Sequence, residues 1–82
     1  MYLNVYNTFF DKIFEMLEEE GCEPSAQKDE WYITFKVSGD SQFEEVKERI
    51  DRISLQTFGK TDKRRRVRIR RYKQKCTVNF IC

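Results

Sequence analysis

The stretch "WYITFKVSGDSQFEEVKERI", residues 31–50, contains two different apolar periods and decides the fold. In its first part every second residue is apolar, which predicts a half-buried strand. The residues that would face the core are Trp31, Ile33, Phe35 and Val37. After Ser38-Gly39-Asp40 the apolar residues recur every three or four positions, which predicts an amphipathic helix. Its core side would consist of Phe43, Val46, Ile50 and Ile53.

Polar residues around this helix support the prediction. Ser41 and Glu44 have the spacing of a capping box at its start. Two acid–base pairs, Glu45 with Arg49 and Glu48 with Arg52, have the four-residue spacing of helix ion pairs. Leu55 and Phe58 would complete its packing before Gly59.

Residues 8–20, "TFFDKIFEMLEEE", predict another amphipathic helix, which ends at Gly21. It opens with a Thr8-x-x-Asp11 pattern similar to a capping box. Three consecutive glutamates at positions 18–20 are interpreted as a solvated helix end, with an acidic patch for a basic partner as the alternative.

Two further segments of the N-terminal half have weaker patterns. "MYLNVY", residues 1–6, alternates like a strand, but it also fits the first turn of the following helix; we favour the strand. Residues 22–27 predict an edge strand that contains Pro24 and joins the strand at 31–37 through a polar turn.

The C-terminal quarter contains "KRRRVRIRRYKQK", residues 63–75. Val67 and Ile69 alternate with arginines, so its middle is predicted to be a half-buried strand with Arg66, Arg68 and Arg70 on the outer face. "KCTVNFIC", residues 75–82, predicts a last strand of the opposite parity, so a turn or bulge is expected near residues 71–75.

Together these elements predict one small α+β domain over residues 1–82, a two-layer sandwich with an antiparallel sheet and two helices on one face. The order is β-α-β-β-α-β-β, whose first six elements resemble the ferredoxin-like order, or α-β-β-α-β-β if residues 1–6 are helical. The open sheet is similar in general chemistry to that of RNA-recognition domains. The strand at 31–37 lacks their glycine and aromatic spacing, so membership is not inferred.

The charge is unevenly distributed along the chain. Residues 1–59 contain six Lys/Arg and thirteen Asp/Glu, whereas residues 60–82 contain ten Lys/Arg and only Asp62 as an acid. This asymmetry predicts that a phosphate-bearing partner contacts the face of the protein formed by the basic C-terminal quarter and avoids the acidic helices.

Several classes of function have no support in the composition. The chain has no histidine and only three cysteines, Cys22, Cys76 and Cys82, without a CxxC pair, so no metal, no cofactor and no enzymatic activity are expected. The cysteines are interpreted as buried core residues in a reducing compartment. No apolar run is long enough to span a bilayer, which predicts a cytoplasmic protein, or a nuclear one if "KRRR" is a localisation signal.

The leading hypothesis is nucleic-acid binding, RNA or DNA, through the basic strand and hairpin. The candidate binding residues are Lys63, Arg64, Arg65, Arg66, Arg68, Arg70, Arg71, Lys73, Lys75, Tyr32 and Lys36. The alternative is a small interaction or inhibitor protein, of the kind that phages use as accessory proteins, which docks on an acidic protein surface. An exposed sheet edge could also pair two copies into a homodimer.

Overall fold

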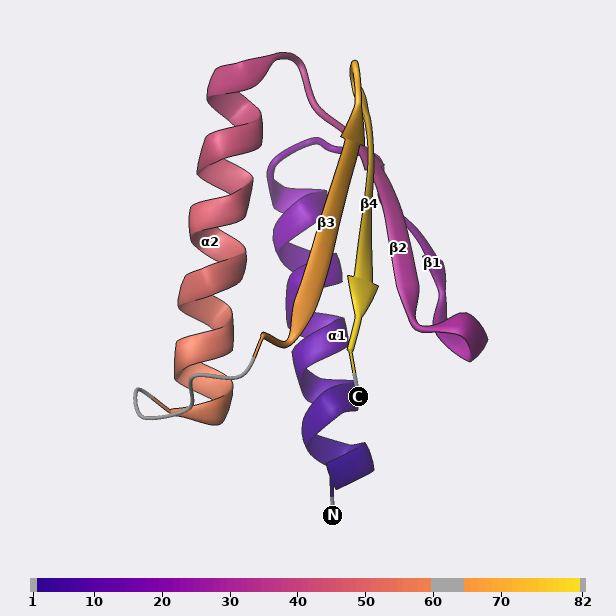
Figure 1. Cartoon of the computed structure of the whole chain (residues 1–82), viewed down its shortest axis with the longest axis vertical. Helices are drawn as coiled ribbons and strands as arrows, with labels where there is room; N and C mark the ends of the chain where they lie inside the picture. The colour runs from indigo at the N-terminus through magenta and orange to yellow at the C-terminus, as the bar shows by residue number, and fades with distance from the viewer. Residues whose placement is uncertain (1, 60–64, 82) are drawn as a thin grey trace.

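The computed structural model describes residues 2–59 and 65–81, and Figure 1 shows how their elements are arranged. Within these residues two helices lie against one face of a four-stranded antiparallel sheet with the strand order β1-β2-β4-β3. The predicted two-layer α+β fold is confirmed, in the order α-β-β-α-β-β. The elements are α1 (Tyr2–Glu19), β1 (Ser25–Gln27), a 3-10 helix (Lys28–Glu30), β2 (Tyr32–Lys36), α2 (Asp40–Phe58), β3 (Val67–Tyr72) and β4 (Lys75–Phe80).

The start of the chain is helical, so the predicted strand at residues 1–6 is wrong. Tyr6, which lies in this segment, is buried and continues the helical stripe of Phe9, Phe10 and Ile13. The predicted capping box at Thr8 is also wrong. Thr8 lies inside α1, where its hydroxyl donates a hydrogen bond of 3.0 Å to the main-chain oxygen of Asn4.

The core fills the space between the two helices and the inner face of the sheet. The larger part of its buried side chains comes from α1 and from alternate positions of β2 and β4. Trp31, predicted as a core anchor, packs edge-on against Tyr6 and Phe10 at ring-centre distances of 6.4 and 5.8 Å. The buried apolar residues are Tyr6, Phe9, Phe10, Ile13, Met16, Leu17, Cys22, Ile33, Phe35, Val37, Val46, Ile50, Cys76, Val78 and Phe80.

A two-residue turn, Lys73-Gln74, joins β3 to β4 and explains the change of parity. With Tyr72 paired to Lys75, odd-numbered residues of β3 lie opposite even-numbered residues of β4, and both sets face the helices. The expected turn is therefore present, but it is shorter than predicted, because Arg71 and Tyr72 still belong to β3.

The start of α2 differs from the prediction in one respect. Gly39, not Ser41, is the N-cap residue of α2. Glycine has no side chain that could bond to the first turn, so the predicted capping box is absent. Instead, Gln42 reaches back, and its side-chain oxygen accepts a hydrogen bond of 2.7 Å from the main-chain N–H of Ser38. The predicted core side of the helix is confirmed, with Val46 and Ile50 fully buried and Phe43 and Ile53 packed against the core.

Candidate nucleic-acid interface

The second face of the sheet carries no helix of the described chain, and we call it the open face. Its side chains come from alternate positions of the four strands, and residues paired across strands point to the same side. The register arranges them in three rows across the sheet: Gln27, Tyr32, Asn79 and Arg68; Ser25, Thr34, Thr77 and Arg70; Lys36, Lys75 and Tyr72.

Four cations border the open face along two adjoining sides. Arg68 and Arg70 succeed one another on β3, and Lys75 and Lys36 are paired with each other at the hairpin end of β4 and β2. We call these four residues the cationic row. All four are exposed, and no outward position of the described strands holds an aspartate or glutamate. The row therefore presents positive charge that these strands do not neutralise.

Tyr72 occupies the corner between the two sides of the cationic row. This residue is 73% exposed, and the ammonium nitrogen of Lys73 lies 5.5 Å from the centre of its ring. The second tyrosine of the open face, Tyr32, is half-buried and stands opposite Asn79. An exposed aromatic ring beside cations is the combination that stacks on unpaired bases.

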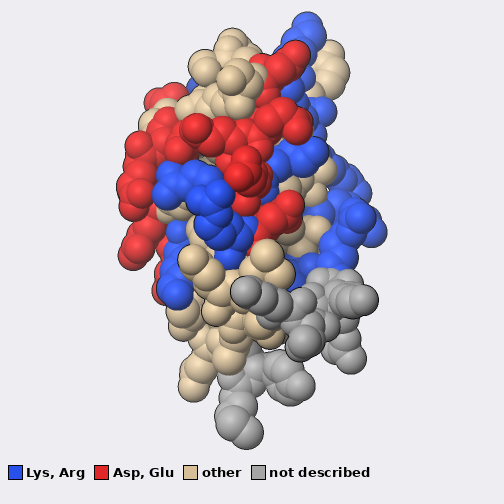
Figure 2. All heavy atoms as spheres, turned by 90° about the vertical axis from the view of Figure 1, so that its left-hand side faces the viewer, with Lys and Arg blue, Asp and Glu red and all other residues tan. Residues whose placement is uncertain are grey.

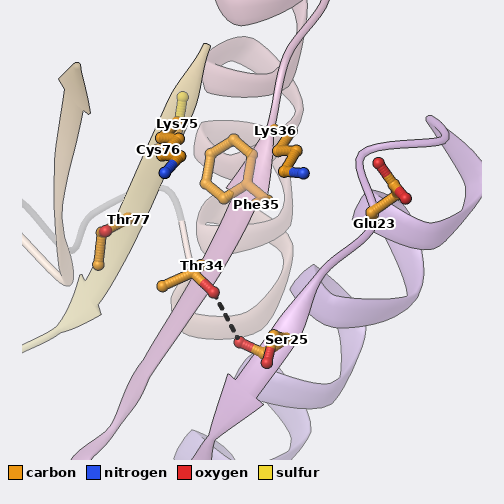
Figure 3. A pocket seen from close by; sticks show the side chains of 8 residues that line it. All are labelled: Glu23, Ser25, Thr34, Phe35, Lys36, Lys75, Cys76 and Thr77. Carbon is orange, nitrogen blue, oxygen red and sulfur yellow. Dashed lines mark hydrogen bonds between the residues drawn. The ribbon is translucent and has the colours of Figure 1, made fainter. Parts of the chain in front are cut away.

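A shallow depression of about 380 Å³ lies at the lysine end of the open face. Figure 3 shows Lys36 and Lys75 at this depression, with Thr34 and Thr77 below them and Glu23, which precedes β1, on the far side. Cys76 contributes to its wall from the core side, and burial raises the pKa of its thiol. Such a thiol is a packing group and not an activated nucleophile.

Five of the predicted binding residues lie on the open face: Tyr32, Lys36, Arg68, Arg70 and Lys75. Arg65 is exposed but lies on the helix side, where it lines a groove between α2 and β3 with Lys47 and Asp51. Lys73 is exposed in the hairpin turn. Lys63 and Arg64 lie outside the described residues.

Arg66 was predicted to point outward beside Arg68 and Arg70, and this is wrong. It precedes β3, and its guanidinium carbon lies 4.3 Å from the ring centre of Phe58, near the end of α2. Its Nη1 donates a hydrogen bond of 2.6 Å to the Tyr6 hydroxyl. Because the strand starts one residue later than predicted, the alternation does not extend to Arg66, and its side chain covers the aromatic end of the core.

Arg71 was predicted to lie in the turn and contact phosphates, but it is on the helix-facing side of β3. Its Nη1 lies 2.8 Å from an Asp40 carboxylate oxygen, and its guanidinium carbon lies 4.9 Å from the ring centre of Phe43. Its Nε also donates a hydrogen bond of 2.6 Å to the main-chain oxygen of Lys73. These contacts connect the hairpin to the first turn of α2, so Arg71 has a structural role.

The helix layer has the opposite electrostatic character. Figure 2 shows acidic side chains concentrated over the upper part of the helix side, with Lys and Arg along the right-hand edge where the sheet lies. Arg49 of α2 bridges to the end of α1, with its Nη1 2.8 Å from Glu20 and its Nη2 3.4 Å from Glu19. This replaces the predicted pair of Arg49 with Glu45, whereas the predicted pair of Glu48 with Arg52 forms at 2.9 Å.

The three glutamates at positions 18–20 are therefore only partly a solvated helix end. Glu20 shares a hydrogen bond with Glu45 and another with Arg49, and both lower the pKa of its carboxyl. The same hydrogen bond to Glu20 raises the pKa of Glu45. Glu20 thus joins the two helices.

In the described residues neither helix is long and apolar enough to cross a membrane.

Sequence reasoning omitted Tyr72 and five other polar residues of the open face from the candidate site: Ser25, Gln27, Thr34, Thr77 and Asn79. The alternation of "KCTVNF" carries the signal for two of them, since Thr77 and Asn79 have the parity opposite to the buried Cys76 and Val78.

No protein-family model matches the chain, and neither a curated protein nor a solved structure matches it significantly.

Proposed function

We propose that this protein binds nucleic acid through the open face, with the cationic row on the phosphates. The observation that carries the proposal is an exposed row of four cations on a sheet face whose described strand positions hold no acid. Phosphate contacts supply most of the affinity of non-specific nucleic-acid binding. Arg68 and Arg70 stand about 6.6–6.8 Å apart along the strand, a spacing suited to successive phosphates.

The acidic helix layer supports a single binding orientation. The helices α1 and α2 contain nine Asp/Glu and four Lys/Arg, a formal excess of five negative charges, and both helices lie on the sheet face opposite to the open face. A polyanion is repelled from that layer and attracted to the sheet. The electrostatic field of the protein would therefore orient the two molecules before they come into contact. Arg66 and Arg71 support the binding surface indirectly, because they hold β3 and the hairpin against the helices.

Fluorescence anisotropy with labelled 20-mer oligonucleotides of DNA and RNA tests the proposal across a salt series. Replacing Arg68 and Arg70 by Gln should weaken binding and flatten the plot of log affinity against log salt. The slope should change by about 0.7 for each phosphate that is no longer neutralised on a single strand, or by about 0.9 on a duplex. Lys12→Gln is the matched control, since it removes one exposed cation from α1. It should leave affinity nearly unchanged.

Two results would overturn the proposal. One is the absence of binding to any oligonucleotide at low salt, and the other is binding that the Arg68 and Arg70 changes leave unaltered. An acidic protein surface is the competing partner, because carboxylates could pair with the same four cations. A complex with an acidic cellular protein at low salt that the Arg68 and Arg70 changes weaken, together with no oligonucleotide binding, would favour that partner.

A further inference from the structure

We infer that the nucleic acid bound on the open face is single-stranded, with its backbone following a bent path along the cationic row and its bases lying on the neutral centre of the face. This inference rests on the proposed function. Three features of the open face lead to it: the shape of the cationic row, the chemistry of the area that the row encloses and the tyrosine at its corner.

The cationic row turns a corner. Arg68 and Arg70 run along β3, whereas Lys75 and Lys36 run across the strands from β4 to β2. Successive members of the row are separated by typical backbone and Cβ spacings of a sheet. These are about 6.6–6.8 Å between Arg68 and Arg70 along β3, about 7–8 Å for the diagonal neighbours Arg70 and Lys75, and about 5 Å for the directly paired Lys75 and Lys36. A backbone that contacts all four must change direction within a few nucleotides.

Such a turn distinguishes single strands from duplexes. A DNA duplex has a persistence length of about 150 base pairs, so its axis stays straight across this sheet and its phosphates keep fixed helical positions that cannot adjust to the corner without a large bending energy. A single strand bends freely at this scale. A straight duplex could contact one side of the cationic row at a time, whereas a single strand can contact both.

The area inside the corner is neutral and can form hydrogen bonds. It is formed by Tyr32 and Asn79 in one row and by Thr34 and Thr77 in the next, and no charged side chain occupies these four positions. Amide and hydroxyl groups of this kind bond to base edges, which a single strand exposes and a duplex engages in pairing. The depression beside Thr34 and Thr77 gives a base room at the lysine end.

Tyr72 stands at the corner itself, where a bent backbone would splay two bases apart. Tyr72 is 73% exposed, so a base can reach its ring. Stacking of a base on an aromatic ring is worth about 1–3 kcal/mol, which corresponds to about 5–150-fold in affinity. A paired base in a duplex has both faces covered and cannot stack on this ring.

The test compares three 10-mers at one salt concentration by fluorescence anisotropy: a single-stranded oligonucleotide, the duplex of the same sequence and a single strand whose bases are replaced by abasic sites. The single strand should bind at least about tenfold more tightly than the other two. Tyr72→Leu should weaken only the base-bearing single strand, by about 5–150-fold, and Tyr72→Phe should retain its affinity. Because Tyr72 is exposed, both variants should fold, and circular dichroism checks this.

The outcomes separate this inference from the proposed function. Equal binding of duplex and single strand, or of abasic and base-bearing single strands, would overturn the inference while leaving nucleic-acid binding intact. A reduction of affinity with Tyr72→Phe equal to that with Tyr72→Leu would also overturn it, because stacking does not need the hydroxyl. If none of the three probes binds at low salt, the proposed function itself fails.

Discussion

Arg66 and Arg68 are two positions apart in the same basic run, yet their side chains have different surroundings. The Arg66 guanidinium is held over Phe58 and donates to the Tyr6 hydroxyl, whereas Arg68 is exposed on the open face. Neighbouring residues of the same type therefore have separate roles, Arg66 in stability and Arg68 in the proposed binding.

This difference gives a prediction for Arg66→Gln. The change removes a cation–π contact and a hydrogen bond that are both partly buried, so the free energy of unfolding should fall by about 1–3 kcal/mol. Urea unfolding followed by Trp31 fluorescence measures it. Oligonucleotide affinity at a temperature where the variant is folded should stay within about twofold of the parent, since Arg66 lies off the cationic row.

Tyr6→Phe is the matched change, because it removes only the hydroxyl that accepts from Arg66. In a double-mutant cycle the two substitutions should be non-additive, with a coupling energy of about 0.5–1.5 kcal/mol. Unchanged stability of Arg66→Gln combined with a large fall in affinity would show that Arg66 belongs to the binding surface instead.

The sequence could not separate these arginines. Alternation predicts which face a residue occupies only where the strand has already begun, and the first strand residue of the run is Val67. Arg71 shows the same limit at the other end, because the length of the turn decides whether it lies in the loop or on the inner face of β3. Where the strand register was well defined, at Arg68, Arg70, Tyr32 and Lys36, the predicted outward orientation is confirmed.

At the scale of the elements, α1 and α2 are connected by the ion pair of Glu20 with Arg49 at 2.8 Å. Hydrogen bonds with Glu45 and Arg49 lower the pKa of Glu20, and the one from Arg49, which stays charged across this pH range, makes the ionised form of Glu20 stabilise the folded state. This contribution is fully present above pH 4.5, the ordinary pKa of a glutamate, and is lost as the pH falls through the lower folded-state pKa. Glu20→Gln should therefore cost stability at neutral pH, by about 1 kcal/mol, and progressively less below pH 4.5.

Urea unfolding of the parent and Glu20→Gln between neutral and strongly acidic pH tests this expectation. Glu45→Gln is the control with the opposite sign. The raised pKa of Glu45 means that its protonated form stabilises the fold, and glutamine keeps a donor toward Glu20 at every pH. That variant should not lose stability at neutral pH. A constant difference between parent and Glu20→Gln at all pH values would contradict the role of Glu20.

The order of elements was predictable where a periodic segment was long. Residues 31–37 and 43–53 contain enough repeats to separate a period of two from one of three or four, and β2 and α2 follow those patterns. Residues 1–6 are too few to do so. Alternation over six residues is also compatible with one helical face, and the continuous stripe from Tyr6 to Leu17 decides in favour of the helix.

The strand β3 lies at the edge of the sheet, where the predicted homodimer would form by strand pairing. If two copies paired antiparallel through β3, the arginines of both would line the same outer face of the joined sheet. Like charges on neighbouring strands are destabilising, and charged residues on an edge strand are a common protection against such pairing. The arginines therefore disfavour a homodimer through this edge, while they leave the open face accessible.

For the whole molecule, net charge and charge position make different contributions to binding a polyanion. The formal net charge is only +2, so attraction must come from the separation between a basic sheet face and an acidic helix layer. If position decides, adding one acid to the open face should be far more harmful than adding it elsewhere, although the net charge changes by the same amount.

Thr77→Glu and Gln56→Glu form the matched pair for this test. Thr77 is half-buried at the centre of the open face, directly opposite Arg70, whereas Gln56 is exposed on α2. A carboxylate at position 77 would neutralise Arg70 and repel a neighbouring phosphate, so affinity for a single-stranded oligonucleotide should fall at least about tenfold and the salt slope should flatten by about 0.7. Gln56→Glu should change affinity by less than about twofold, because salt screens a distant exposed charge. Equal reductions in the two variants, both shown to be folded by circular dichroism, would mean that net charge and not the open face drives binding.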